Sequence, residues 1–138
     1  MESGYELKTI LVSAAVIIEG GKVLVTQREE GDSHGLFWEF PGGKIEDGED
    51  PRRALQRELR EELGIEVKVE KIWDVVFHVY PEYPVLLLFY LCRIEKGVPR
   101  PIGCRALRWV DGRELPEIPL LPADVPLIEG LREKLDAP

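Results

Sequence analysis

The sequence is poor in the residues that would place it in several protein classes. Its 138 residues include only two cysteines, and acidic side chains outnumber basic ones by 26 to 18. Cys92 and Cys104 lack metal-ligand spacing, so we expect two buried free thiols rather than a zinc module or a disulfide framework. A formal net charge of −8 argues against a nucleic-acid polymer as partner, because the chain has no excess of basic side chains to neutralise phosphates.

Long apolar runs are also missing. No run approaches the ~18 residues of a membrane span, and the start of the chain lacks the basic and apolar pattern of a signal peptide. We therefore expect a cytoplasmic protein without a membrane partner. The length suits one domain over residues 1–138 with its own core. A small nucleotide stays compatible with the acidic charge if a metal ion supplies positive charge locally.

Residues 50–64 carry the clearest helix signal. Asp50 is a capping residue, Pro51 suits the first helical position, and Gly64 is a typical stop. Between them an apolar stripe predicts the buried flank of the helix, formed by Ala54, Leu55, Leu59 and Leu63.

Apolar and β-branched segments predict a mixed sheet with helices on both faces. The apolar segment 85–93 is expected to be a central strand. A closing helix is expected over 124–135. The other expected strands are 10–18, 23–28, one or two strands within 65–80, and 106–110, with a short apolar piece at 36–40.

Three glutamates, at positions 58, 61 and 62, lie on one face of the predicted helix because positions i, i+3 and i+4 are neighbours. Carboxylates crowded in this way repel one another at neutral pH. A chain that keeps them together is expected to bind a cation, and an all-oxygen ligand set suits Mg²⁺ or Mn²⁺ better than zinc.

The segment 43–65 reads Gly-x5-Glu-x7-Arg-Glu-Leu-x-Glu-Glu-x-Gly-Ile and resembles the Nudix hydrolase signature without a substitution. The preceding segment 38–44, Trp-Glu-Phe-Pro-Gly-Gly-Lys, is similar to the MutT-like branch. The resemblance implies an α/β/α sandwich around a mixed sheet, with the signature as loop–helix–loop. It also implies hydrolysis of a nucleoside triphosphate to the monophosphate and pyrophosphate.

The same resemblance assigns roles to residues of the signature. It implies that Glu58, Glu61 and Glu62 bind the metal together with the backbone carbonyl of Gly42. Arg57 would orient these glutamates through ion pairs. Its alternative interpretation is a solvent-exposed charge.

Three residues outside the helix align with nucleotide contacts of MutT-like enzymes. Arg28 matches a phosphate-contacting arginine, although a plain strand-end charge is the alternative. Phe40 matches a residue that lines the base pocket, where an aromatic face stacks on any base. Tyr80 is expected to line the same pocket or, equally, to pack in the core. His34 is expected to be solvent-exposed, with an approach to the substrate from its loop as the alternative.

Asp124 is the candidate for base selection. In MutT the corresponding position is an asparagine that reads 8-oxoguanine, whereas an ionised aspartate only accepts hydrogen bonds and so suits the amino group of cytosine. This resembles the CTP pyrophosphohydrolase subgroup. A protonated Asp124 would also donate and would suit oxidised purines. Its alternative role is to cap the last helix.

One family feature is missing. Many MutT-like proteins carry a further glutamate where this chain has Gly103, so the general base is left open among the signature helix, Glu46, Glu39 and a metal-bound hydroxide. We expect a small nucleotide as substrate, with cytosine nucleotides slightly ahead of 8-oxo-dGTP. The rivals are another nucleoside diphosphate derivative, such as ADP-ribose or a dinucleoside polyphosphate, and a nucleotide sensor without turnover. Monomer and homodimer both stay open.

Overall fold

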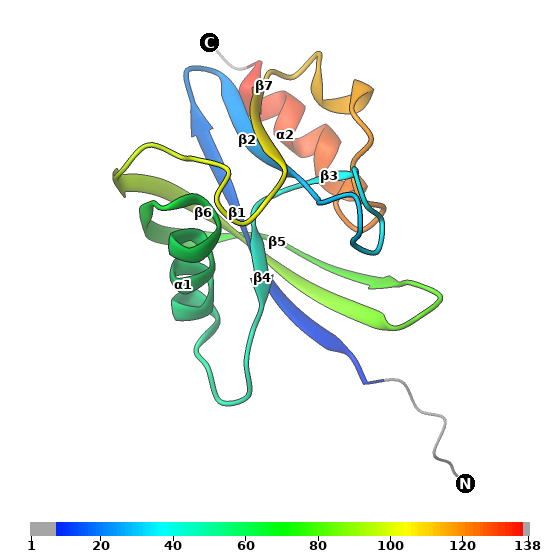
Figure 1. Ribbon diagram of the computed structural model, residues 1–138. Helices are drawn as coiled ribbons and strands as arrows, with labels where there is room; N and C mark the ends of the chain where they lie inside the picture. The colour runs from blue at the N-terminus through cyan, green and yellow to red at the C-terminus, as the bar shows by residue number, and fades with distance from the viewer. Residues whose placement is uncertain (1–7, 137–138) are drawn as a thin grey trace, which may run out of the picture.

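The computed structural model describes residues 8–136, and its centre is a strongly twisted seven-stranded mixed sheet (Figure 1). Five strands follow the order β3-β2-β1-β6-β5, while β4 pairs with β1 and β7 pairs with β2. The strands are β1 (Ile10–Glu19), β2 (Lys22–Gln27), β3 (Trp38–Glu39), β4 (Gly42–Lys44), β5 (Glu66–Val79), β6 (Pro84–Lys96) and β7 (Ala106–Val110).

Strand β6 occupies the interior of the sheet, as its apolar sequence predicted. It runs parallel to β1, with Ile10 opposite Val85, and antiparallel to β5 on its other side. The expected strand 65–80 is a single strand, and its three register shifts against β6 all lie before Asp74. The turn at residues 19–22 joins β1 to β2 as a tight hairpin.

Helix α1 (Pro51–Leu63) begins and ends where the sequence predicted. The Asp50 side chain accepts a hydrogen bond from the Arg52 N–H at 2.7 Å, and Gly64 closes the helix in the left-handed conformation with φ = 70°. The Ser13 hydroxyl donates to the Pro51 carbonyl at 2.8 Å and so anchors the first turn to β1. The position of the helix is therefore fixed at its start and along its apolar flank.

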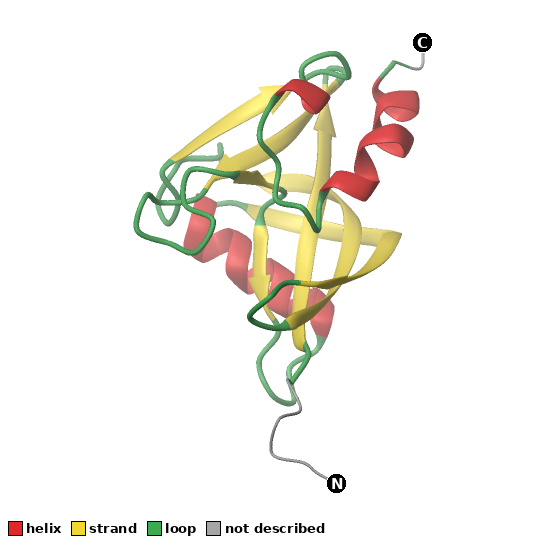
Figure 2. Ribbon diagram, turned by 90° about the vertical axis from the view of Figure 1, so that its right-hand side faces the viewer, coloured by secondary structure: helices red, strands yellow, loops and turns green. Residues whose placement is uncertain are grey.

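Helices α1 and α2 (Ile128–Leu135) lie on opposite sides of the sheet (Figure 2). A hydrophobic core lies on each face, because neighbouring side chains of a strand point to opposite faces. Ala15 and Ile17 of β1 pack with the leucines of α1, whereas Ala14 and Val16 pack with the C-terminal helix α2. The expectation of helices on both faces is confirmed. Cys92 and Cys104 are buried free thiols, as predicted.

The expected closing helix over 124–135 is wrong in its first turn. Residues Val125–Leu127 form the short 3₁₀ helix η2, and the α-helix starts only at Ile128; another 3₁₀ helix, η1, covers Leu115–Glu117. Pro126 lacks a backbone N–H and restricts the residue before it, which favours this separate turn. Asp124 makes no side-chain capping bond, so the capping alternative is also wrong. Within residues 8–136 no helix is long and apolar enough to cross a membrane.

Candidate active site

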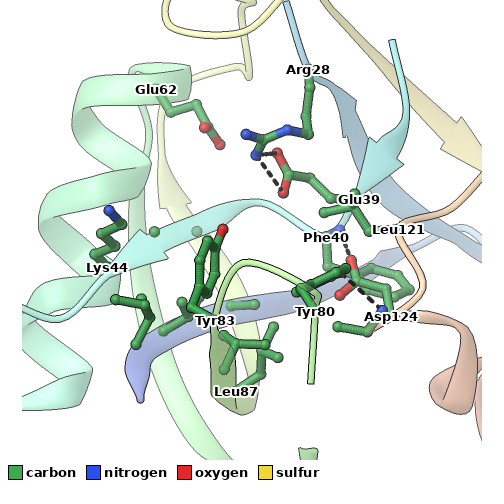
Figure 3. A pocket seen from close by; sticks show the side chains of 17 residues that line it. Arg28, Glu39, Phe40, Lys44, Glu62, Tyr80, Tyr83, Leu87, Leu121 and Asp124 are labelled. Atoms are coloured by element: carbon green, nitrogen blue, oxygen red, sulfur yellow. Dashed lines mark hydrogen bonds and ion pairs between the residues drawn. The ribbon is translucent and has the colours of Figure 1, made fainter. Parts of the chain in front are cut away.

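A cavity of about 210 Å³ opens between the end of α1 and the segment that precedes α2 (Figure 3). Its floor comes from β1 and β6, one wall from the chain between β3 and β4, and the opposite wall from the β5–β6 turn. Its lining includes seven residues that the sequence analysis named for the site: Arg28, Glu39, Phe40, Gly42, Glu62, Tyr80 and Asp124. The fold therefore brings together groups that lie up to 96 residues apart in the sequence.

Arg28 lies between two carboxylates at one end of the cavity, those of Glu39 and Glu62 (Figure 3). Its Nη1 atom is 3.3 and 3.4 Å from the two oxygens of Glu39, and its Nε–H donates to the Ser33 carbonyl at 2.8 Å. Burial raises the pKa of Glu39 to about 7, and the positive charge of Arg28 offsets this increase only in part. The guanidinium is thus held at the cavity and aimed across it.

Glu62 presents an unpartnered carboxylate oxygen to this cavity. Its Oε1 atom is buried and finds no hydrogen-bond partner among the described residues. Burial, helped by the nearby charges of Glu39 and Glu58, raises the pKa of Glu62 to about 8. A buried, unsatisfied carboxylate is costly, and a bound ion is one of the few groups that satisfies it.

Glu58 and Gly43 are in direct contact, so the carboxylate of α1 lies against the backbone of β4. A Cβ atom at position 43 would overlap the Glu58 carboxylate, so only glycine allows the carboxylate to lie this close to the backbone. Burial also raises the pKa of Glu58. Glu61, by contrast, is 62% exposed and turned toward solvent. The three helix glutamates thus share a face but differ widely in their surroundings.

Arg57 lies at the centre of an ion-pair network that joins the signature loop to α1. Its Nε and Nη2 atoms donate to Glu49 at 2.8 and 3.0 Å, and its Nη1 donates to Glu58 and Glu61 at 3.2 Å each. Its Nη2 also donates to the Lys44 carbonyl at 3.2 Å. The paired guanidinium lowers the pKa of Glu49 to about 2. One side chain therefore orients two of the helix carboxylates.

The opposite end of the cavity holds Asp124, which is 2% exposed. Its Oδ2 atom accepts a hydrogen bond from the Phe40 N–H at 3.0 Å, 84 residues earlier in the chain. Burial raises the pKa of Asp124 to about 8. Tyr80 completes this end, because its hydroxyl accepts from the Ala123 N–H at 3.2 Å while its ring packs in the core. Tyr80 therefore lines the cavity and also packs in the core.

Short backbone pairing explains why Asp124 reaches this position. The Trp38 N–H donates to the Pro119 carbonyl at 2.8 Å, and the Leu121 N–H donates to the Trp38 carbonyl at 2.9 Å. The segment before η2 is thereby fixed to β3, next to Phe40. One end of the cavity thus carries carboxylates and an arginine, and the other end carries a buried acid beside aromatic rings. This arrangement suits a ligand that has a polyphosphate at one end and a base at the other.

A model of the NUDIX domain matches residues 13–130 of the chain. The chain belongs to the Nudix hydrolase family. Its relatives include the CTP pyrophosphohydrolase of Escherichia coli, 38% identical over 126 residues that cover 90% of this chain and 92% of that protein. An 8-oxo-dGTP diphosphatase of Haemophilus influenzae is 35% identical over 127 residues, covering 90% of this chain and 92% of that protein.

Solved structures of Nudix proteins agree with the fold. The E. coli ORF135 protein superposes with a TM-score of 0.78 at 36% identity and covers 96% of both chains. A MutT Nudix hydrolase from Burkholderia pseudomallei superposes with a TM-score of 0.81 at 29% identity, over 88% of this chain and 97% of its own. The α/β sandwich expected from the signature is therefore confirmed.

Nudix hydrolases generally require a divalent metal, and the residues of this site fit one. The donors are all oxygens: the Glu62 carboxylate lies next to the Gly42 backbone, and its Oε1 atom has no partner among the described residues. Within the described part of the chain, no three His, Cys, Asp or Glu side chains already converge as a metal cage. Glu61 does not line the cavity and pairs with Arg57 at 3.2 Å.

The structure also distinguishes between the residues that could act as general base in place of the glutamate missing at position 103. The Gly103 N–H donates to the Glu62 carbonyl at 2.9 Å, and a Cβ atom there would come within 3.2 Å of the Glu62 Cα. Glu46 lines a different hollow of the surface, on the other side of β4. Glu39 lines the Nudix site itself. Of Glu39 and Glu46, only Glu39 therefore lines the site.

Among the lining residues that sequence reasoning did not assign to the site are Lys44, Tyr83 and Leu121. Tyr83 stands on the β5–β6 turn, beside Tyr80, and nothing in a loop sequence indicates such a position. The prediction of a solvent-exposed His34 is wrong. This residue is half-buried, and its ring centroid lies 5.0 Å from that of Tyr80. The loop folds back because His34 and Leu36 adopt positive φ angles of 56° and 69°.

Proposed function

We propose that this Nudix hydrolase cleaves nucleoside triphosphates to the monophosphate and pyrophosphate, with cytosine nucleotides as its preferred substrates. The observation that carries the proposal is the buried Asp124, held by the Phe40 N–H at one end of a cavity whose other end holds Arg28 and Glu62. The relative named CTP pyrophosphohydrolase supports the same assignment.

The base end of the cavity suits cytosine. Its exocyclic amino group donates a hydrogen bond, and either protonation state of Asp124 offers an oxygen that accepts it. A protonated Asp124 in addition donates to the ring nitrogen beside that amino group. Phe40 and Tyr80 supply aromatic surface on which the base can stack. Uracil presents a carbonyl where cytosine has the amino group, so the ionised form of Asp124, which only accepts hydrogen bonds, disfavours it.

The phosphate end would hold the metal and the triphosphate. Glu58, Glu61, Glu62 and the Gly42 carbonyl are the proposed ligands of Mg²⁺, with Mn²⁺ as a substitute. A bound divalent ion neutralises phosphate charge and lowers the pKa of its water. Arg57 positions the carboxylates through its ion pairs.

Arg28 is the proposed contact to the phosphates. Its distances of 3.3 and 3.4 Å to Glu39 are long for a charge-assisted hydrogen bond, so this pair gives way readily to a more highly charged phosphate. Glu39, left beside the phosphates, is then the proposed acceptor of the proton of the attacking water. Its place within the site favours it over Glu46.

Oxidised guanine nucleotides are a second candidate, and one observation favours them. Burial raises the pKa of Asp124 to about 8, so near neutral pH the free enzyme holds a carboxylic acid that both donates and accepts. Such a group also pairs with the altered edge of 8-oxoguanine. The H. influenzae relative bears the name 8-oxo-dGTP diphosphatase.

The test measures pyrophosphate release with Mg²⁺ from CTP, dCTP, 5-methyl-dCTP, UTP, dGTP and 8-oxo-dGTP. We expect kcat/KM for CTP to exceed that for UTP by about 10- to 100-fold, the range of one good base contact. Asp124→Asn should alter this ratio, whereas Asp136→Asn, far from the cavity, should leave it unchanged. Equal rates on CTP and UTP would refute base selection by Asp124. Hydrolysis of none of the six would refute the proposed reaction.

A further inference from the structure

The segment 29–37, which joins β2 to β3, folds back on itself beside the Nudix site. His34 and Leu36 adopt positive φ angles of 56° and 69°, a left-handed backbone conformation that residues other than glycine rarely adopt. Between them, a Cβ atom at Gly35 would overlap the Glu30 carbonyl, so the loop is tightly closed. Such a conformation persists only where the surrounding contacts determine it, and it is commonly found at binding sites.

Arg28 contacts this loop through both its backbone and its side chain. Its backbone N–H donates to the Phe37 carbonyl at 2.9 Å, and its Nε–H donates to the Ser33 carbonyl at 2.8 Å. Its Nη1 makes only the long contacts to Glu39 at 3.3 and 3.4 Å, and its Nη2 donates no hydrogen bond in the part of the chain that the structure describes. The loop thus fixes one edge of the guanidinium, while the other edge faces Glu62 across the cavity (Figure 3).

His34 anchors the peptide group that Arg28 contacts. The Ser33 carbonyl and the His34 N–H belong to one peptide, so the position of the His34 side chain bears directly on the contact to Arg28. The His34 ring is half-buried, and its centroid lies 5.0 Å from that of Tyr80 and 5.8 Å from that of Phe37. Aromatic pairs attract one another at these distances. Tyr80 is a firm support, because it is only 7% exposed and its hydroxyl is hydrogen-bonded.

We propose that His34 is a positioning residue for Arg28. Its ring, packed on Tyr80, holds the Ser33–His34 peptide where the carbonyl accepts the Arg28 Nε–H, and this contact directs the remaining guanidinium nitrogens toward the phosphates of the substrate. His34 does not line the cavity, so it acts through Arg28 and not by touching the nucleotide. The inference rests on the proposed function for one point, the role of Arg28 as the phosphate contact.

The chain offers a matched control in its other histidine. His78 of β5 is also half-buried, and its ring centroid lies 4.5 Å from that of Tyr80. His34→Asn removes one ring from Tyr80 and keeps the backbone of the loop, because asparagine adopts positive φ angles readily. His78→Asn removes the other ring from the same tyrosine and leaves the Ser33–His34 peptide intact. A difference between the two variants therefore belongs to the loop and not to the packing of Tyr80.

NMR spectroscopy of the arginine Nε–H groups tests the positioning without any need for turnover. The Arg28 signal is assigned by its loss in Arg28→Lys, and its exchange with water is measured in the full chain. We expect slow exchange in the wild type and in His78→Asn, and exchange at least about 10-fold faster in His34→Asn, the effect of losing one hydrogen bond to a charged group. Far-ultraviolet circular dichroism and Tm establish that each variant is folded. Fast exchange in the wild type, or equal exchange in the two histidine variants, would overturn the proposal.

Steady-state kinetics with Mg²⁺ test the consequence for the substrate, using the nucleoside triphosphate that the wild type hydrolyses fastest. His34→Asn should raise KM about 10-fold, the worth of one charged hydrogen bond, and His78→Asn should change it far less. In an Arg28→Lys background, which already lacks the Nε–H, His34→Asn should have no further effect. Equal increases of KM in the two histidine variants, or effects that multiply in the double variant, would contradict action through Arg28. A wild type without turnover would refute the proposed function, and the exchange measurement would still decide the role of His34.

Discussion

Replacing Asp124 by asparagine tests whether the buried acid is neutral in the folded enzyme. The side chains have the same shape, and the asparagine oxygen can still accept the hydrogen bond from the Phe40 N–H that now spans 3.0 Å. The variant therefore removes one titrating group from the cavity and keeps its packing. Any difference between the two chains in how the free energy of unfolding depends on pH is then due to the Asp124 carboxyl group.

The magnitude follows from proton linkage. Burial raises the pKa of Asp124 from 3.8 to about 8, so between these values the folded chain holds a proton that the unfolded chain has released. The free energy of unfolding of the wild type must then fall as pH rises, by about 1.4 kcal/mol per pH unit for one proton. Asp124→Asn lacks this proton. Its stability relative to the wild type should therefore rise by the same slope and level off above the folded pKa.

The assay is urea denaturation of both chains in EDTA at a series of pH values, with free energies compared at equal m-values. Glu39 and Glu62 titrate in both chains, so the difference between the curves isolates Asp124 to first order. Two curves that stay parallel from pH 3.8 to about 8 would mean that Asp124 is ionised while buried. The argument for a neutral acid in the base pocket would then fail.

Three further changes address the metal end of the site. Glu62→Gln replaces the carboxylate that carries the unpartnered oxygen with a neutral amide. The stabilisation that bound Mg²⁺ gives the wild type, about 2.7 kcal/mol at 100 times its Kd, should then be absent from thermal melts. An equal increase of Tm with Mg²⁺ in both chains would contradict Glu62 as a ligand. Arg57→Lys cannot reproduce the forked contacts to Glu49 and should lower kcat/KM by about 10- to 100-fold, and wild-type kinetics would show that the network is dispensable. Gly43→Ala should displace the Glu58 carboxylate and reduce turnover with little loss of Tm, whereas Gly31→Ala, with open space around it, should change neither.

The sequence by itself determined the local elements and the chemistry of the helix. Asp50, Pro51 and Gly64 fix where α1 begins and ends, because caps and stops act through bonds between neighbouring residues. The spacing of the glutamates fixes which face they share, since helical periodicity is local as well. The signature also sufficed to identify the family and hence the sandwich around a mixed sheet.

Only the tertiary structure decided the properties that depend on burial and on distant contacts. It placed Asp124 against the Phe40 N–H instead of at a helix cap, because Pro126 shifts the helix start and the preceding segment pairs with β3. It raised the pKa values of Asp124, Glu39 and Glu62, since desolvation has no counterpart in a sequence pattern. It also left Phe77 61% exposed near the end of β5, because exposure depends on which elements pack against a strand and not on the strand's own sequence.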